Sequence, residues 1–280
     1  MQETFSKQLL HINAYLSFGI IKALSICQGC TKTVVSSDYD AQLQDLLTEY
    51  KPFDAQAPRF FLFGMGNRNK YVYKDFKLLS VADGSVACEF SDALNDSIMP
   101  ADYRVSIETA GGVVNIYEDE AGIWVEAEGK VEQLPGSSAH VSLPSFENFK
   151  YGQVLRVLLH EKLFNVKDGK IYPNLFVCRQ PFYRDAFMAA LCLEKTGNTI
   201  LIAPWISNEE NIYDMQNSEA EGDNLGQMLY MLSFVPDTCN LLLRRRLKAE
   251  IEKRTVVKDG FKYIYGNTDG APNAEYATQI

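Results

Sequence analysis

The hydrophobic positions of the chain change their period once, near residue 144. Before this point, apolar and polar residues alternate in short runs such as KYVYKDFKLLSV and YRVSIETA. These runs are separated by residue pairs typical of turns, such as Asp83-Gly84. Alternation with a period of two, broken by turn residues, is typical of antiparallel strands. The pattern predicts an antiparallel β domain over residues 58–145, arranged as a β-sandwich.

After residue 144 the apolar positions recur at helical spacing. The segments expected there are a helix with one apolar stripe at 146–165, a nearly all-apolar inner helix at 184–195 that Gly197-Asn198 ends, a short helix or strand at 199–206, a helix capped by Asp223, and a helix at 239–254. From Thr255 onward the sequence is loop-like. The pattern predicts paired helical hairpins over residues 146–280, and an α+β multidomain chain as a whole.

The lengths of the connections carry further information. Links that follow an inner helix are short, whereas the acidic link over residues 207–222 leads into an inner helix and is long. Such a difference is unusual for a plain helical bundle. A ring of helical hairpins explains it, because all inner helices then begin on one rim. Helix N-termini and polar loops gathered there suit hydroxyl-rich or anionic ligands.

Composition narrows the classes of partner. The chain has 280 residues, 46% of them hydrophobic, and a net charge of -9, which argues against nucleic acid as a partner. Its three histidines are scattered, and one CxxC pair has no second pair, so we expect no metal and no cofactor. The stretch Gly64-Met65-Gly66-Asn67-Arg68 lacks the third glycine and the following helix of a dinucleotide site. It predicts a tight connection with a structural Arg68.

The first 57 residues form a separate segment, either signal-like or a tether. Ile12 to Cys30 is mostly apolar, and Gly29-Cys30 is similar to a bacterial lipoprotein processing site. This interpretation predicts export and membrane attachment through lipidation at Cys30. The alternative is an amphipathic helix packed on the body of a cytoplasmic protein.

Three short motifs carry a resemblance to a known family. Phe182-Tyr183-Arg184-Asp185 begins an inner helix, Leu193-Glu194-Lys195-Thr196-Gly197-Asn198 ends it, and Asp223-Asn224-Leu225-Gly226-Gln227 begins the next inner helix. The chain resembles the six-hairpin glycosidase superfamily, the (α/α)6 toroids of glucoamylase-like and debranching-type enzymes, in which a β-sandwich often precedes the toroid. In that family an aromatic-Arg-Asp element holds sugar hydroxyls at the cleavage subsite. Residues 146–280 hold only part of six hairpins, so the resemblance implies an incomplete toroid and a C-terminally truncated chain.

The candidate site residues lie around the acidic link. We expect Glu219 or Glu221 to serve as the general acid, because crowded carboxylates can raise one another's pKa. Tyr183, Arg184, Asp185, Trp205 and Asp223 are the expected substrate-binding residues. Structural alternatives exist for these residues: a helix cap for Asp223, solvated carboxylates for the two glutamates, a buried partner of Asp185 or of a loop carbonyl for Arg184, and core packing for the aromatic rings.

Two functions follow from these expectations. The first is a glycoside hydrolase-like protein that acts on or binds an α-linked oligosaccharide and is inactive if the second carboxylate lies in missing hairpins. The alternative is a non-catalytic, carbohydrate-binding or envelope-associated lipoprotein on the same scaffold. An incomplete ring would also leave apolar helix faces uncovered, which predicts self-association.

Overall fold

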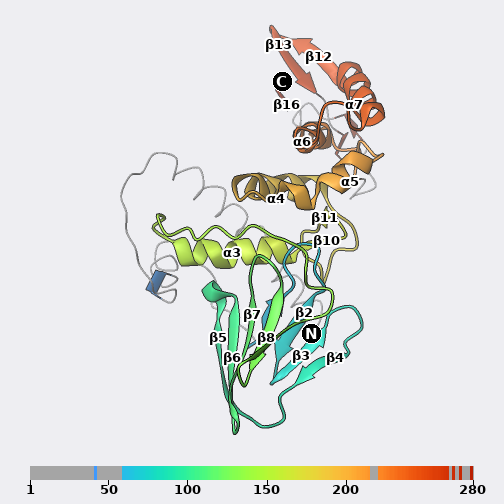
Figure 1. Ribbon diagram of the computed structural model, residues 1–280. Coiled ribbons are helices and arrows are strands. Elements are labelled where there is room, and N and C mark those ends of the chain that lie inside the picture. The colour runs from blue at the N-terminus through green and yellow to red at the C-terminus, as the bar shows by residue number, and fades with distance from the viewer. Residues whose placement is uncertain are drawn as a thin grey trace. The chain divides into compact units, whose positions relative to one another are not determined.

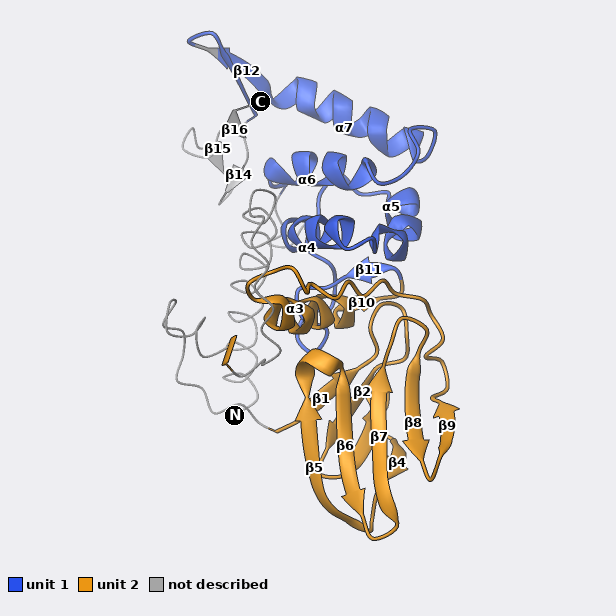
Figure 2. Cartoon of the chain, turned by 60° about the vertical axis from the view of Figure 1, so that its left-hand side comes forward, with its two compact units in different colours: residues 1–18, 169–280 blue, residues 19–168 orange. Residues whose placement is uncertain are grey.

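The computed structural model describes residues 41–42, 59–214, 220–264, 267–268, 271–272 and 278–279 (Figure 1). The chain divides into two compact units, residues 19–168 and residues 1–18 with 169–280 (Figure 2). We call them the β unit and the helical unit. None of the helices in the described ranges is long and apolar enough to cross a membrane. Cys30 and the predicted segment 1–57 lie outside the described residues, apart from Ala41 and Gln42.

The β unit contains two antiparallel sheets. The first has the strand order β1 (Phe61–Phe63), β2 (Tyr71–Lys74), β3 (Lys77–Ser80), β4 (Val86–Glu89). The second is a meander of β5 (Ala93–Met99), β6 (Arg104–Thr109), β7 (Gly112–Glu118), β8 (Ile123–Ala127) and β9 (Lys130–Gln133), with the 3-10 helix η2 (Pro100–Asp102) after β5. The two-residue turn Glu128-Gly129, with φ of 51° and 74°, joins β8 to β9 and shows why the predicted turn pairs work.

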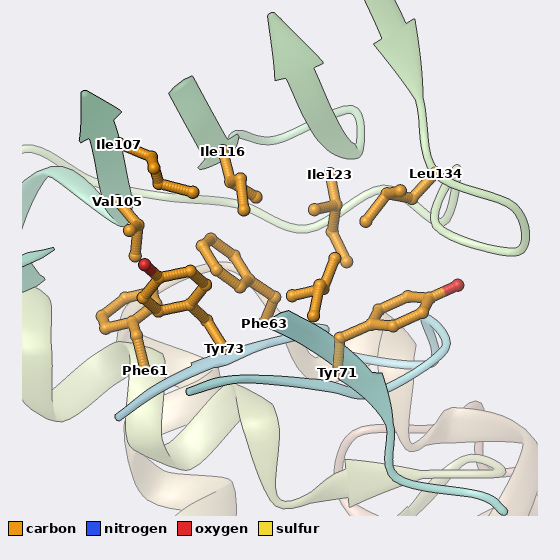
Figure 3. Packing of buried hydrophobic residues seen from close by; sticks show 10 residues of the cluster. Phe61, Phe63, Tyr71, Tyr73, Val105, Ile107, Ile116, Ile123 and Leu134 are labelled. Atoms are coloured by element: carbon orange, nitrogen blue, oxygen red, sulfur yellow. The ribbon is translucent and has the colours of Figure 1, made fainter. Parts of the chain in front are cut away.

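The core of the β unit lies between the two sheets (Figure 3). Alternate residues of each strand point inward, so the polar residues between them face outward. The buried side chains are Phe61, Phe63, Tyr71, Tyr73 and Leu78 from the first sheet and Val105, Ile107, Ile116 and Ile123 from the second, with Leu134 beyond β9. The predicted antiparallel β domain is confirmed, and its sheets pack face to face.

The connection between β1 and β2 is held by a buried ion pair. Arg68 Nη1 donates to Glu118 Oε1 over 2.9 Å, and neither side chain is exposed. The Glu118 carboxylate also accepts the main-chain N–H groups of Gly64 at 2.9 Å and Met65 at 2.6 Å. Arg68 further donates to the carbonyl oxygens of Ala139, Asp119 and Glu120. Arg68 is therefore structural, as predicted.

A buried lysine completes this connection. Lys70 Nζ donates to the carbonyl oxygens of Gly64 and Gly66 and lies 5.3 Å from the centre of the Phe164 ring. Burial lowers the pKa of Lys70 to about 7. The backbone at position 64 lies so close to Asn69 that only glycine fits there. Its φ is 116°, and a Cβ would lie 2.4 Å from the carbonyl oxygen of Asn69.

The helix α3 (Gly152–Phe164) belongs to the β unit. Tyr103 Oη donates to the Arg156 carbonyl over 3.0 Å, and the Gly66 N–H donates to the Leu163 carbonyl over 2.8 Å. The two compact units divide at 168/169, so α3 is grouped with the strands and not with the segment after the predicted boundary at 145/146. The predicted helix start at 146 is early, since Phe146 has φ of 56°, which interrupts a helix.

His160 on α3 lies between two aromatic rings of the β unit. Its ring stacks on Phe61 at 4.9 Å between centres and on Tyr103 at 5.5 Å. Its Nε2 is buried, makes no hydrogen bond with a described residue and is 4.0 Å from Glu118 Oε2. The imidazole thus packs α3 against the sheets as an aromatic ring, and its Nε2 has no hydrogen-bond partner in the part of the chain that the structure describes.

The helical unit confirms most of the predicted helices. It contains α4 (Tyr183–Lys195), the 3-10 helix η3 (Thr199–Leu201), α5 (Ala203–Asn208), α6 (Asp223–Leu232) and α7 (Leu241–Arg254). The predicted short segment at 199–206 is helical, in two pieces. Together with the sheets of the β unit, these helices confirm the α+β class.

The loop predicted from Thr255 onward is wrong. Strands β12 (Thr255–Lys258) and β13 (Phe261–Ile264) form an antiparallel hairpin around Asp259-Gly260, whose φ values of 54° and 81° suit a two-residue turn. Shorter strands complete the secondary structure: β10 (Val166–Lys167) in the β unit, and β11 (Lys170–Ile171), β14 (Asn267–Thr268), β15 (Ala271–Pro272) and β16 (Thr278–Gln279) in the helical unit.

Candidate functional site

The start of α4 is capped from a distant part of the chain. No side chain of its own N-cap residue, Phe182, satisfies the first N–H groups. Instead Asp214 Oδ2 accepts the N–H of Tyr183 over 2.6 Å. A carboxylate at this position balances the partial positive charge of the helix N-terminus.

The start of α6 meets the same residue. The Asp214 N–H donates to Asn224 Oδ1 over 3.1 Å, and the Asn224 N–H donates to the Glu221 carbonyl over 3.2 Å. Tyr183, Asp214, Asn224 and Glu221 are thus joined by successive hydrogen bonds. We call the first turns of α4 and α6, together with Asp214, the helical rim.

The two helices run parallel from the rim. At their opposite ends Tyr230 Oη of α6 donates to Glu194 Oε2 of α4 over 2.9 Å, and the Tyr230 ring meets Phe187 at 5.0 Å between centres. Two N-termini therefore lie at one edge of the unit, as the connection lengths predicted. Figure 2 shows the two helices one above the other.

Arg184 is the predicted residue with the clearest capacity to bind a ligand. It lies in the first turn of α4, is exposed, and makes no hydrogen bond or ion pair with any described residue. The structural alternative, in which Arg184 is a buried partner of Asp185, is wrong. Asp185, one residue further, is half-buried and has interactions of its own.

The acidic residues of the rim have different surroundings. Glu221 is half-buried, and Glu219 lies outside the described residues. Asp223 is exposed and its Oδ2 accepts from Gln227 Nε2 over 2.8 Å. The helix-capping role predicted for Asp223 is wrong, because α6 begins at Asp223 itself and no side chain caps it from position 222.

Tyr183 and Trp205 are core residues, which is the alternative for these rings. They are 3% and 5% exposed, and their ring centres are 6.4 Å apart. Tyr183 Oη donates to the Asn211 carbonyl over 2.7 Å, and burial raises the pKa of its phenol. Neither ring has a face exposed enough for a sugar to stack on. Both rings are part of the core that packs beneath the helical rim.

Sequence reasoning missed Glu209. Its carboxylate accepts from Trp205 Nε1 over 2.6 Å and from the N–H groups of Glu210 and Asn211 over 3.0 and 2.9 Å. It thereby orders the start of the link that leads to Asp214. The available signal was its spacing of four residues from Trp205 at the end of a short helix.

The rim combines half-buried carboxylates, two helix N-termini and an exposed guanidinium that no described residue binds. These groups donate and accept hydrogen bonds within one small region, which suits a ligand rich in hydroxyl groups. Among the described residues, no group of three or more His, Cys, Asp or Glu side chains is placed to hold a metal ion. No protein-family model, curated protein or solved structure matches the chain.

Proposed function

We propose that the helical unit binds an α-linked oligosaccharide at the helical rim, as part of a glycoside hydrolase-like protein. The observation that carries this proposal is the double role of Asp214, which ties the starts of α4 and α6 to one edge. These two hydrogen bonds of Asp214 bring the first turn of α4, which carries Arg184, to the same edge as Glu221 before α6.

Arg184 supplies the binding chemistry. Its planar guanidinium has five N–H donors in a fixed geometry, which matches pairs of neighbouring sugar hydroxyls. Because no described residue occupies these donors, they are available to a ligand. Asp185 and Asp223 provide carboxylate oxygens that accept from hydroxyl groups in the same first turns.

The same geometry supports a toroidal arrangement as part of the proposal. α4 and α6 act as parallel inner helices, and the long link between them arrives at their shared rim. α7 runs the opposite way: Arg244 Nη2 near its start donates to the Leu232 carbonyl at the end of α6, and Glu250 near its end accepts from Tyr213 Oη. This alternation is that of successive hairpins in an (α/α)6 ring.

For hydrolysis, Glu221 is the proposed general acid, with Glu219 as the other candidate. Glycosidic cleavage needs a proton donor and a second carboxylate on the opposite side of the bond. One observation favours the alternative of binding without hydrolysis: Asp214 and Asp223 already accept hydrogen bonds that hold α4 and α6. Activity therefore requires Glu221 or Glu219 together with a further carboxylate.

Calorimetric titration of the full chain with linear malto-oligosaccharides tests binding. Arg184→Ala should weaken binding at least tenfold, about 1.4 kcal/mol, at an unchanged melting temperature. Arg245→Ala is the matched control, because Arg245 is an exposed arginine on α7. Failure of the wild-type chain to bind any α-linked oligosaccharide, or an equal effect of both variants, would contradict the proposal.

Reducing-sugar release from the same oligosaccharides separates the two functions. If the chain hydrolyses them, Glu221→Gln or Glu219→Gln should abolish release and retain binding. If the wild-type chain binds and releases nothing, the non-catalytic alternative holds and the general-acid role is wrong.

A further inference from the structure

The outer face of the five-stranded sheet carries a row of aromatic and polar side chains. Arg104, Tyr117, Trp124 and Gln133 lie directly opposite one another on β6, β7, β8 and β9. We call these four residues the outer row. In Figure 2 this sheet faces the viewer, and no other described strand or helix of the β unit lies in front of it.

Burial confirms that the outer row faces away from the core. Its neighbours Val105, Ile116 and Ile123 are fully buried between the sheets. Arg104, Tyr117 and Trp124 are partly exposed, as alternation along each strand requires. Two aromatic rings on the adjacent strands β7 and β8 therefore share an outward face, each one residue from the end of its strand.

A second row of polar groups flanks the first. Ser106 Oγ lies 2.6 Å from Asn115 Oδ1, and Asn115 Nδ2 donates to Glu126 Oε2 over 3.2 Å. These three residues are cross-strand neighbours on the same outward face. Their mutual hydrogen bonds fix the side chains before any ligand arrives, which lowers the entropy cost of binding.

The outer row itself holds two polar groups that make no hydrogen bond or ion pair with the described residues. The Arg104 guanidinium lies 5.1 Å from the centre of the Tyr117 ring. Neither the guanidinium nor the Tyr117 hydroxyl makes a hydrogen bond or ion pair with a described residue. An oriented arginine and a phenol are thus left available beside two aromatic rings.

We propose that the outer row binds a saccharide chain lying across β6 to β9. Aromatic rings contact the C–H faces of sugar rings, while the guanidinium, phenol, amide and carboxylate groups around them bond the hydroxyls at the ring edges. Three strand spacings give the row a length of roughly 14 Å, enough for several sugar rings.

The surroundings argue against other ligands. Glu108 and Glu126 lie on the same face, and the net charge of the chain is -9, so a nucleic acid backbone would be repelled. The polar second row is unsuited to a lipid surface. The site is distinct from the helical rim in residues and in unit, so either proposal can fail without the other.

Native affinity electrophoresis of the full chain tests the outer row. The gels contain starch or hydroxyethyl cellulose, which distinguish neutral α-linked from neutral β-linked chains. At least one polysaccharide should retard the wild-type chain. Arg104→Ala should weaken this affinity about tenfold, and Tyr117→Phe, which removes only the hydroxyl, about threefold.

Three controls sharpen the result. Arg245→Ala removes one positive charge, as Arg104→Ala does, but from α7. Val113→Ala shortens an exposed side chain of β7. Both variants should be retarded as strongly as the wild type. A bound sugar should protect the fluorescence of Trp124 from quenching by acrylamide. In the Arg184→Ala variant this protection should be the same as in the wild type. That signal is specific, because Trp205, the other tryptophan, is 5% exposed.

The proposal is overturned by any of three results. They are no retardation in any gel, retardation that Arg104→Ala and Tyr117→Phe leave unchanged, and retardation without protection of Trp124. Thermal melts of each variant show whether it is folded. If Arg104→Ala is not, Tyr117→Phe decides alone.

Discussion

The buried His160 makes a quantitative prediction about the stability of the β unit. Its ring lies between Phe61 and Tyr103, and its Nε2 makes no hydrogen bond with a described residue. Burial lowers the pKa of His160 from 6.5 to about 4; the positive charge of Lys70 also lowers it, and a hydrogen bond with the Leu62 backbone opposes the shift. His160 is therefore neutral in the folded β unit at neutral pH.

The sign of the pH dependence follows from this depressed pKa. Between pH 6.5 and 4 the unfolded chain binds a proton at His160 and the folded chain does not. Acidification through this window consequently favours unfolding. A shift from 6.5 to about 4 corresponds to about 3 kcal/mol of unfolding free energy, present above pH 6.5 and lost toward pH 4.

His160→Phe should remove this dependence, because phenylalanine keeps an aromatic ring between Phe61 and Tyr103 and cannot titrate. Urea unfolding between pH 4.5 and 7.5 measures the effect. In a Trp205→Phe background the fluorescence of Trp124 reports the β unit alone. Carboxylates titrate in the same range in both proteins, so the difference between their pH profiles isolates the histidine.

The control is His140→Phe, at an exposed position of the same unit, which should keep the wild-type pH profile. If His160→Phe loses stability between pH 6.5 and 4.5 as steeply as the wild type, the buried neutral imidazole is not the cause. The reasoning from burial would then be refuted.

Two further predictions concern the other buried contacts. Glu118→Gln should lower the unfolding free energy of the β unit by about 3–5 kcal/mol, because it leaves Arg68 buried without its carboxylate, whereas Glu126→Gln on the outer face should cost under about 1 kcal/mol. Equal urea midpoints for the two variants would contradict this. Asp214→Ala should destabilise the helical unit by about 1 kcal/mol through loss of the cap at Tyr183, and an unchanged thermal melt would show that the cap contributes nothing.

Local patterns predicted the elements whose causes are local. The strands of the β unit follow from alternation and turn pairs, since one face of each strand is buried and the other is not. α4 follows from its apolar run and its end near Gly197-Asn198. The shared rim followed from connection lengths, because a long link can join two helices that start at the same edge.

Features that depend on distant partners could not be predicted. The apolar stripe of α3 indicates that one face is buried, but not that the face packs on the sheets through His160. Asp214 caps a helix that begins 31 residues before it in the chain. The hairpin around Asp259-Gly260 has only four residues in each strand, which is too short for alternation alone to distinguish a strand from a loop.

The attachment of α3 to the sheets decides how the protein can be dissected. A gene split at the change of hydrophobic period, near residue 144, would remove α3 from the sheets. The sheets would lose the His160 ring that covers Phe61 and the Arg156 carbonyl that accepts from the Tyr103 hydroxyl, so part of the core would be exposed. The two compact units divide after residue 168, so a split there keeps α3 with the sheets. Recombination that shuffles these halves must therefore transfer the helix with the strands.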